Sequence, residues 1–130
     1  HYDFLQIDIE PALNSFKVLQ KIPWEKASFG LISFEHDHYL DCDDIRKKSR
    51  EYLKSKGYKL LVSDISPTYT LNKPNVSYED WWYHPDHVSK AAVKVMKDVS
   101  DGNKNAINYI YNITDGAVHT KDQEFVKVPW

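Results

Sequence analysis

Acidic side chains follow three apolar segments of the chain, at the points where β-strands are expected to end. They are Asp8 and Glu10 after the first segment, Glu35 and Asp37 after the second, and Asp64 after the third. In open α/β sheets, ligands bind beyond the carboxyl ends of the strands. We therefore predict that these carboxylates meet at one rim of a sheet, where the chemistry of the protein would take place.

Two kinds of chemistry suit such a rim. Carboxylate oxygens are the ligands that magnesium and manganese prefer, so Asp8, Glu10, Glu35 and Asp37 are candidate ligands of a divalent cation. His36 lies between two of these acids, and an imidazole can act as a general base near neutral pH. A purely structural alternative stays open, because acids that follow strands also cap the helices that come next.

The segments that position these acids alternate between strand and helix. Short apolar runs at 2–9, 29–34 and 58–65 predict buried strands. Apolar residues at helical spacing predict a first helix over 11–22, and a second helix is expected to end at Gly57. Helical crossovers of this length join parallel strands. The predicted fold class is α/β, a three-layer, Rossmann-like partial sheet that is mainly parallel.

The chain departs from this alternation after the third predicted strand. Two prolines, Pro67 and Pro74, predict a loop over 66–77. The aromatic segment 78–85 then predicts a short strand. The loop before it is too short for a helical crossover, so this strand is expected to pair antiparallel with the third, at an edge of the sheet.

The last third of the chain gives weaker signals. Apolar residues from Val88 to Val99 recur at helical spacing and predict an amphipathic helix. Residues 106–113 fit a helix or a strand, and the end of the chain fits a late strand or a loosely held tail. We therefore divide the chain into a domain of residues 1–112 and a C-terminal extension or edge strand of residues 113–130.

The aromatic segment has a functional and a structural interpretation. Trp81, Trp82 and His84 could bind a flat substrate by stacking. Alternatively, one tryptophan packs in the core, the other covers a sheet edge, and Asp86 caps the helix that follows. The structural interpretation is preferred, because aromatic residues at strand spacing more often belong to a core.

Composition excludes several classes of function. The chain has 130 residues, a net charge of −2, one cysteine and four glycines. This charge gives no field that would attract nucleic acid or anionic lipid, and no apolar run is long enough for a membrane span. No glycine-rich phosphate-binding loop is present. A single cysteine excludes an internal disulfide, and a reducing, cytoplasmic location is expected.

The motifs in order resemble the C-terminal half of FkbM-type, S-adenosylmethionine-dependent methyltransferases. The resemblance rests on the segment from Asp3 to Glu10, the string Phe-Glu-His-Asp ending at Asp37, and Glu-Asp-Trp-Trp from Glu79 to Trp82 before His84. In that family, the first of these segments is the fourth strand of a seven-stranded sheet, and the second ends the fifth. The resemblance covers residues 2 to about 112.

The resemblance also implies roles for individual residues. Asp8 and Glu10 would lie near the methionine end of the cofactor S-adenosylmethionine, and Glu35, His36 and Asp37 would line the side of the methyl acceptor. Trp81, Trp82 and His84 would contact that acceptor, a small molecule or glycan of unknown identity with an oxygen or nitrogen nucleophile.

The resemblance makes a truncated domain the expected form of this sequence. The family's glycine-rich cofactor loop precedes the stretch that the resemblance covers. The chain is therefore expected to be inactive alone. It is also expected either to form a homodimer through an exposed sheet edge or to cover that edge with the tail from Thr114 to Trp130.

Two other functions remain open from the residues alone. One is a divalent-metal-dependent hydrolase or nuclease that uses the strand-end carboxylates. The other is a non-catalytic interaction module that meets its partner through the aromatic segment 78–83, which requires that segment to be exposed.

Overall fold

The computed structural model of the protein describes residues 1–40, 44–65, 77–100, 117–119 and 125–127. In chain order its elements are β1 (Tyr2–Ile7), α1 (Ala12–Lys21), β2 (Phe29–Glu35), the 3-10 helix η1 (His38–Leu40), α2 (Ile45–Ser55), β3 (Lys59–Ile65), β4 (Glu79–Tyr83), α3 (Lys90–Ser100), β5 (Ala117–His119) and β6 (Phe125–Lys127). The α/β class predicted from the sequence is confirmed.

The main sheet has four strands in the order β1-β2-β4-β3. Strands β1 and β2 are parallel, and α1 forms the crossover between them. Strand β4 runs antiparallel to both of its neighbours, β2 and β3. The prediction of a mainly parallel sheet is therefore wrong, because β4 inserts between the two strands that were expected to pair.

The position of β4 corrects a second expectation. It was predicted to be an edge strand, and it is an interior one: Trp82 lies opposite Ile32 of β2 and Leu60 of β3. The predicted antiparallel pairing with β3 is confirmed. Helices pack on both faces of the sheet at this strand, which explains why four of its five residues are buried.

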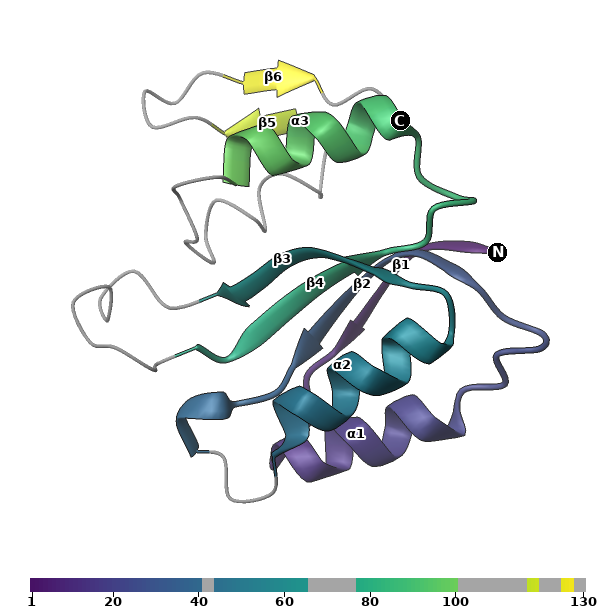
Figure 1. The fold of residues 1–130 in the computed structure, drawn as a ribbon, viewed down its shortest axis with the longest axis vertical. Helices are drawn as coiled ribbons and strands as arrows, with labels where there is room; N and C mark the ends of the chain where they lie inside the picture. The colour runs from purple at the N-terminus through teal and green to yellow at the C-terminus, as the bar shows by residue number, and fades with distance from the viewer. Residues whose placement is uncertain (41–43, 66–76, 101–116, 120–124, 128–130) are drawn as a thin grey trace.

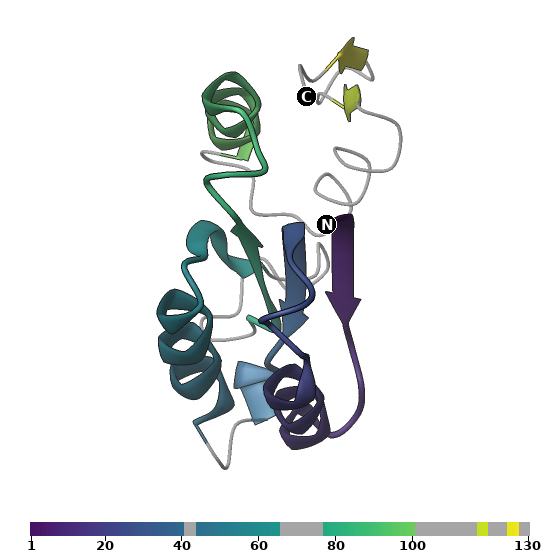
Figure 2. The same cartoon turned by 90° about the vertical axis from the view of Figure 1, so that its right-hand side faces the viewer.

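Helices cover both faces of the main sheet, which gives three layers (Figure 1). Helices α1 and α2 lie side by side on one face (Figure 2), where Leu19 and Leu53 are fully buried against Phe34 and Trp82. Helix α3 packs on the other face. There Val88, Ala92 and Met96 join a second core with Leu31, Leu61, Val62, Ile65 and Trp81.

The ends of the helices follow local chemistry only in part. Gly57 ends α2 in a left-handed conformation with φ of 89°, as its predicted capping role requires. Helix α3 begins later than expected, at Lys90, because the hydroxyl of Ser89 accepts a hydrogen bond from the Ala92 N–H. The predicted cap, Asp86, instead belongs to a turn in which the His87 N–H donates to the His84 carbonyl.

Strands β5 and β6 form a separate antiparallel pair, so a late strand is confirmed near the end of the chain. The predicted loop 66–77 and the ambiguous segment 106–113 lie mostly or entirely outside the described residues. In the part of the chain that the structure describes, no helix combines the length and apolar character that crossing a membrane requires.

Candidate functional site

Strand alternation divides the polar residues at the carboxyl end of β2 between the two faces of the sheet. Ser33 and Glu35 share the face of Leu31, which α3 partly covers, and His36 follows Phe34 on the face of α1 and α2. Adjacent residues of β4 divide in the same way, because Glu79 accepts from Ser33 and Asp80 lies 3.5 Å from His36. The result is two polar clusters, one on each face.

The first cluster contains five carboxyl groups, which we call the acid rim. It consists of Asp8 and Glu10 after β1, Glu35 and Asp37 at the end of β2, and Glu79 at the start of β4. Glu35 is at its centre, close enough to Asp8, Asp37 and Glu79 for these three carboxyl groups to affect its ionisation. The predicted meeting of Asp8, Glu10, Glu35 and Asp37 therefore occurs in the structure.

Crowding of like charges changes the acidity of the rim. Burial, together with Asp8, Asp37 and Glu79, raises the pKa of Glu35 from 4.5 to about 9. Burial also raises the pKa of Asp37, with a further contribution from Glu10. These neighbours therefore favour the protonated form of Glu35 at neutral pH.

Glu79 is a buried member of the rim, with 8% of its surface exposed. One carboxylate oxygen accepts a hydrogen bond of 3.0 Å from the Ser33 hydroxyl, and the other accepts from the Trp81 indole N–H. Burial raises the pKa of Glu79, and these two donors oppose the rise. These two donors hold the carboxylate of Glu79, which lies opposite Glu35 in the pairing of β2 with β4.

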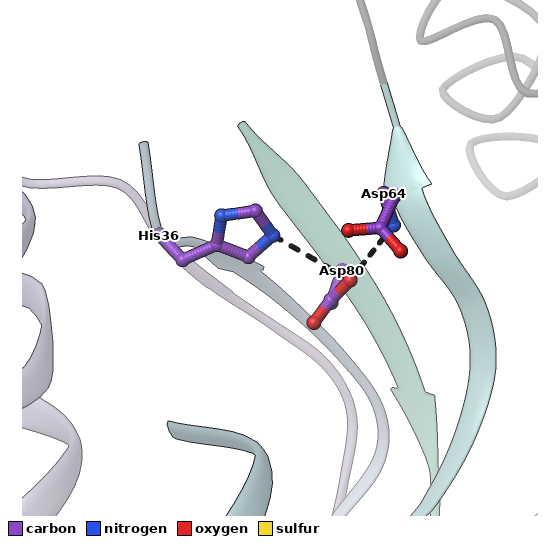
Figure 3. Close-up of side chains that lie close together, drawn as sticks. All are labelled: His36, Asp64 and Asp80. Carbon is purple, nitrogen blue, oxygen red and sulfur yellow. Dashed lines mark hydrogen bonds and ion pairs between the residues drawn. The ribbon is translucent and has the colours of Figure 1, made fainter. Parts of the chain in front are cut away.

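The second cluster, which we call the ion network, centres on Asp80, which lies between His36 and Asp64 (Figure 3). Its members are His36 from the end of β2, Arg46 and Arg50 from α2, Asp64 from β3, and Asp80 from β4. Asp80 is 1% exposed and receives two hydrogen bonds from Arg50 and one from the Asp64 backbone N–H. These contacts tie β3 and β4 to α2.

Paired charges stabilise the ionised acids of this network. Burial opposes ionisation of Asp80, but the hydrogen bonds from Arg50 and the His36 imidazole 3.5 Å away outweigh it and lower the pKa of Asp80 to about 2. Burial also opposes ionisation of Asp64, but Arg46 and Arg50 outweigh it and lower the pKa of Asp64. In turn, the hydrogen bond to Asp80 raises the pKa of Arg50.

Geometry alone would allow a metal ion in the network. One ligand atom each from His36, Asp64 and Asp80 lie within 4.8 Å of one another. However, Arg46 and Arg50 already contact the two carboxylates at 2.6–2.9 Å. Two guanidinium charges balance two carboxylate charges, so a divalent cation would have to displace both arginines. We therefore assign these residues to an ion network and to no metal site.

His36 belongs to the ion network and is turned away from the acid rim. Its side chain is fully buried, its Nδ1 accepts a hydrogen bond from the His38 N–H, and its Nε2 lies 3.5 Å from Asp80. Backbone contacts link the two clusters, because the N–H groups of His36 and Asp37 both donate to the Tyr78 carbonyl. His36 thus anchors the chain between two rim acids.

The aromatic residues are not gathered at the rim. Trp81 and Trp82 are 3% and 0% exposed, so both pack in the core and do not form the exposed surface that an interaction module requires. The expectation that one of them covers a sheet edge is wrong, because β4 is an interior strand. His84 lies at the opposite end of the sheet, where its N–H donates to the Gly30 carbonyl. The physical reason is the antiparallel direction of β4, which carries its last residue away from Glu35.

Sequence reasoning missed Arg46, Arg50, Glu79 and Asp80. The arginines lie in a helix rich in basic residues, where a solvated face was the natural interpretation. Asp80 carried a usable signal, because an acid between aromatic residues of a buried strand requires a partner. Asp64 was expected at the rim, but it joins the ion network because β4 separates β3 from β2.

Comparison with protein-family models, with curated proteins and with solved structures finds no match to this chain.

Proposed function

We propose that this chain forms the trailing half of an S-adenosylmethionine-dependent methyltransferase domain, with its acid rim facing the methyl donor. Two features support the proposal. Strands β1 and β2 are parallel neighbours joined by a crossover helix, as the fourth and fifth strands of that resemblance would be. The acids that follow them meet beyond their carboxyl ends, where open α/β sheets bind ligands.

The observation that carries the proposal is the excess of negative charge at the rim. Burial and the neighbouring carboxyl groups raise the pKa of Glu35 to about 9, so a further negative charge in the rim is unfavourable. A cationic ligand would relieve this repulsion. S-adenosylmethionine fits this requirement because it carries a sulfonium and an ammonium group, whereas S-adenosylhomocysteine lacks the sulfonium charge.

Within this proposal, Asp8 and Glu10 face the methionine end of the donor, because both are exposed and follow β1. Glu35 and Asp37 face the methyl acceptor. The methyl group passes from sulfur to an acceptor oxygen or nitrogen, the sulfonium becomes a thioether, and a rim carboxylate takes the acceptor proton. His36 supports this arrangement by anchoring the backbone between Glu35 and Asp37.

The rim would bind only the cationic end of the donor. The sequence has no glycine-rich loop of the kind that holds a nucleotide. We therefore propose that the chain does not methylate alone and that the pocket is completed across the open edge of β1. Among the described strands, β1 pairs only with β2, and its Tyr2 and Phe4 are exposed.

Calorimetric titration of the chain with S-adenosylmethionine, and separately with S-adenosylhomocysteine, tests the proposal. We expect heat of binding that is stronger for the charged ligand, and weaker binding by Asp8→Asn than by a variant outside the rim such as Asp86→Asn. Absence of heat from both ligands would overturn the proposal.

A divalent cation is the second candidate ligand of the same rim on the chemistry of its carboxylate oxygens alone. Among the described residues, the acids of the rim do not form a group of three whose ligand atoms lie within 4.8 Å of one another. Titration with manganese chloride separates the two candidates. Heat from manganese without heat from S-adenosylmethionine would favour metal-dependent hydrolysis, and no heat at millimolar manganese would exclude it.

A further inference from the structure

The outer surface of the helical layer formed by α1 and α2 carries an excess of lysine. The two helices lie side by side on one face of the main sheet (Figure 2). Five lysine side chains on them are exposed: Lys17 and Lys21 on α1, Lys47 and Lys54 on α2, and Lys56 directly after α2. Helix α1 contains no acidic residue, and the single acidic residue of α2 is Glu51. We call this surface the basic face.

Helical spacing explains why these lysines point away from the sheet. Each residue of an α-helix is rotated by about 100° from the one before it. Leu19 is fully buried, and Lys17 and Lys21 each lie two residues from it, so both are on the opposite side of α1. In α2, Lys47 has the same relation to the buried Ser49. The lysines of both helices therefore share the outer surface of this layer.

The arginines of α2 have partners that the lysines lack. Arg46 and Arg50 pair with Asp64 and Asp80 in the ion network. Among the described residues, no carboxylate forms an ion pair with any lysine of the basic face. Their positive charge is therefore available to an anionic partner.

The fold separates charges that the net charge of −2 adds together. Carboxyl groups gather in the acid rim, beyond the ends of β1 and β2. Exposed acids also flank the helices at Glu10, Glu25 and Asp44, whereas the outward sides of the helices carry lysine apart from Glu51. Salt screens charges that lie more than about 8 Å apart. A partner on the helices therefore responds to the lysines that lie there and only weakly to the net charge.

The side chains of the basic face fit a lipid surface better than a nucleic acid. Proteins read bases with free arginines, and bind single strands by stacking bases on exposed rings. The arginines of α2 are paired, and the rings of Phe16 and Tyr52 pack edge to face against each other across the two helices. Val18, which is 40% exposed, lies directly beside Lys17. An exposed apolar side chain among lysines is typical of surfaces that lie on lipid headgroups.

We propose that the basic face docks on the surface of a lipid bilayer that contains anionic headgroups. The lysines are attracted to the negative surface, and the two helices lie flat on it without entering the hydrocarbon. The acid rim takes no part in this contact. A failure of S-adenosylmethionine binding would therefore leave the proposal unaffected.

Co-sedimentation with vesicles tests the proposal. One set of vesicles contains phosphatidylcholine with about 30% phosphatidylserine, and the other contains phosphatidylcholine alone. We expect the chain to bind the first set and not the second. Raising the salt concentration from about 0.05 M to about 0.5 M should release it, because salt screens exposed charges.

Variants locate the contact on the protein. Each lysine near an anionic surface strengthens binding about fivefold, so Lys17→Gln combined with Lys21→Gln should weaken it about 25-fold. Lys90→Gln combined with Lys94→Gln is the matched control, because it removes two lysines at the same spacing from α3, on the other face of the sheet. It should change binding less than about twofold. Glu51→Gln should strengthen binding about fivefold, a gain that loss of folding would not produce.

Four results would overturn the proposal. Three concern the vesicles: no binding to phosphatidylserine at low salt, equal binding to both sets, and equal losses in the two double variants. The fourth concerns nucleic acid, measured by the fluorescence anisotropy of a labelled DNA duplex of about 20 base pairs. Binding of this duplex at a salt concentration where the anionic vesicles are not bound would assign the basic face to nucleic acid.

Discussion

Arg50 and Asp80 are joined by two hydrogen bonds, of 2.6 Å from Nε and 2.8 Å from Nη2, although 30 residues separate them in the chain. The same carboxylate accepts from the backbone of Asp64 and lies beside the imidazole of His36. One buried acid thus connects the ends of three strands to α2. The acid rim on the opposite face depends on those strand ends for its shape.

Replacing Asp80 by Asn should strongly destabilise the protein. The substitution leaves the guanidinium of Arg50 without its buried counter-charge, and breaking a buried pair in this way costs about 3–5 kcal/mol. Urea denaturation followed by circular dichroism measures the change in the free energy of unfolding. Asp86→Asn, at a side chain that is 82% exposed, should change it by less than about 0.5 kcal/mol. Equal effects of the two variants would show that the Arg50–Asp80 pair does not stabilise the fold.

Stability should fall as the pH rises from about 5 to about 9. Glu35 has a pKa raised from 4.5 to about 9 in the folded chain, so its contribution is fully present below 4.5 and is lost as the pH rises through 9. Thermal unfolding in matched buffers across this range follows the loss. Glu35→Gln, which resembles the protonated acid, should flatten the dependence, and an unchanged slope in this variant would exclude Glu35 as its source.

The acid side of the stability profile should depend on a different residue. The pKa of Asp80 is lowered from 3.8 to about 2, so the stability that it provides is present above 3.8 and is lost as the pH falls towards 2. Acid unfolding followed by tryptophan fluorescence should show this loss. In Asp80→Asn the corresponding part of the profile should be missing, and its persistence would assign the loss to other carboxyl groups.

Gly57→Ala should destabilise the protein by about 1–2 kcal/mol, because a Cβ atom opposes the left-handed backbone that ends α2. Space is not the cause, since the nearest atom to the added Cβ would be Nε2 of His84 at 3.5 Å. Gly57→Asn should cost less, because asparagine tolerates this conformation. Chemical denaturation of both variants checks the order, and an equal cost would point to crowding.

The sequence predicted the elements of this fold better than their arrangement. Alternating apolar segments located β1, β2 and β3 and the helices between them, because each signal is local. The insertion of β4 between β2 and β3 depends on which strand edges pair, and β2 and β4 lie far apart in the sequence. No local pattern around Trp82 separates an interior strand from an edge strand.

The candidate site divides in the same way. The rim acids were predictable, because residues that follow parallel strands share one end of a sheet. The partner of Asp80 was not predictable, because Arg50 lies in a helix whose exposed side is also basic. His36 looked like an accessible base beside two acids, but its ring is fully buried next to Asp80.

The central claim is that the acid rim binds a cation. The most direct test is to measure the protons released when the ligand binds. Calorimetric titration with S-adenosylmethionine at neutral pH, in two buffers of different ionisation enthalpy, counts the protons exchanged. A cation at the rim lowers the pKa of Glu35, so we predict net release of protons and a smaller release in Glu35→Gln. Binding without proton exchange, or with the same exchange in Glu35→Gln, would contradict the claim.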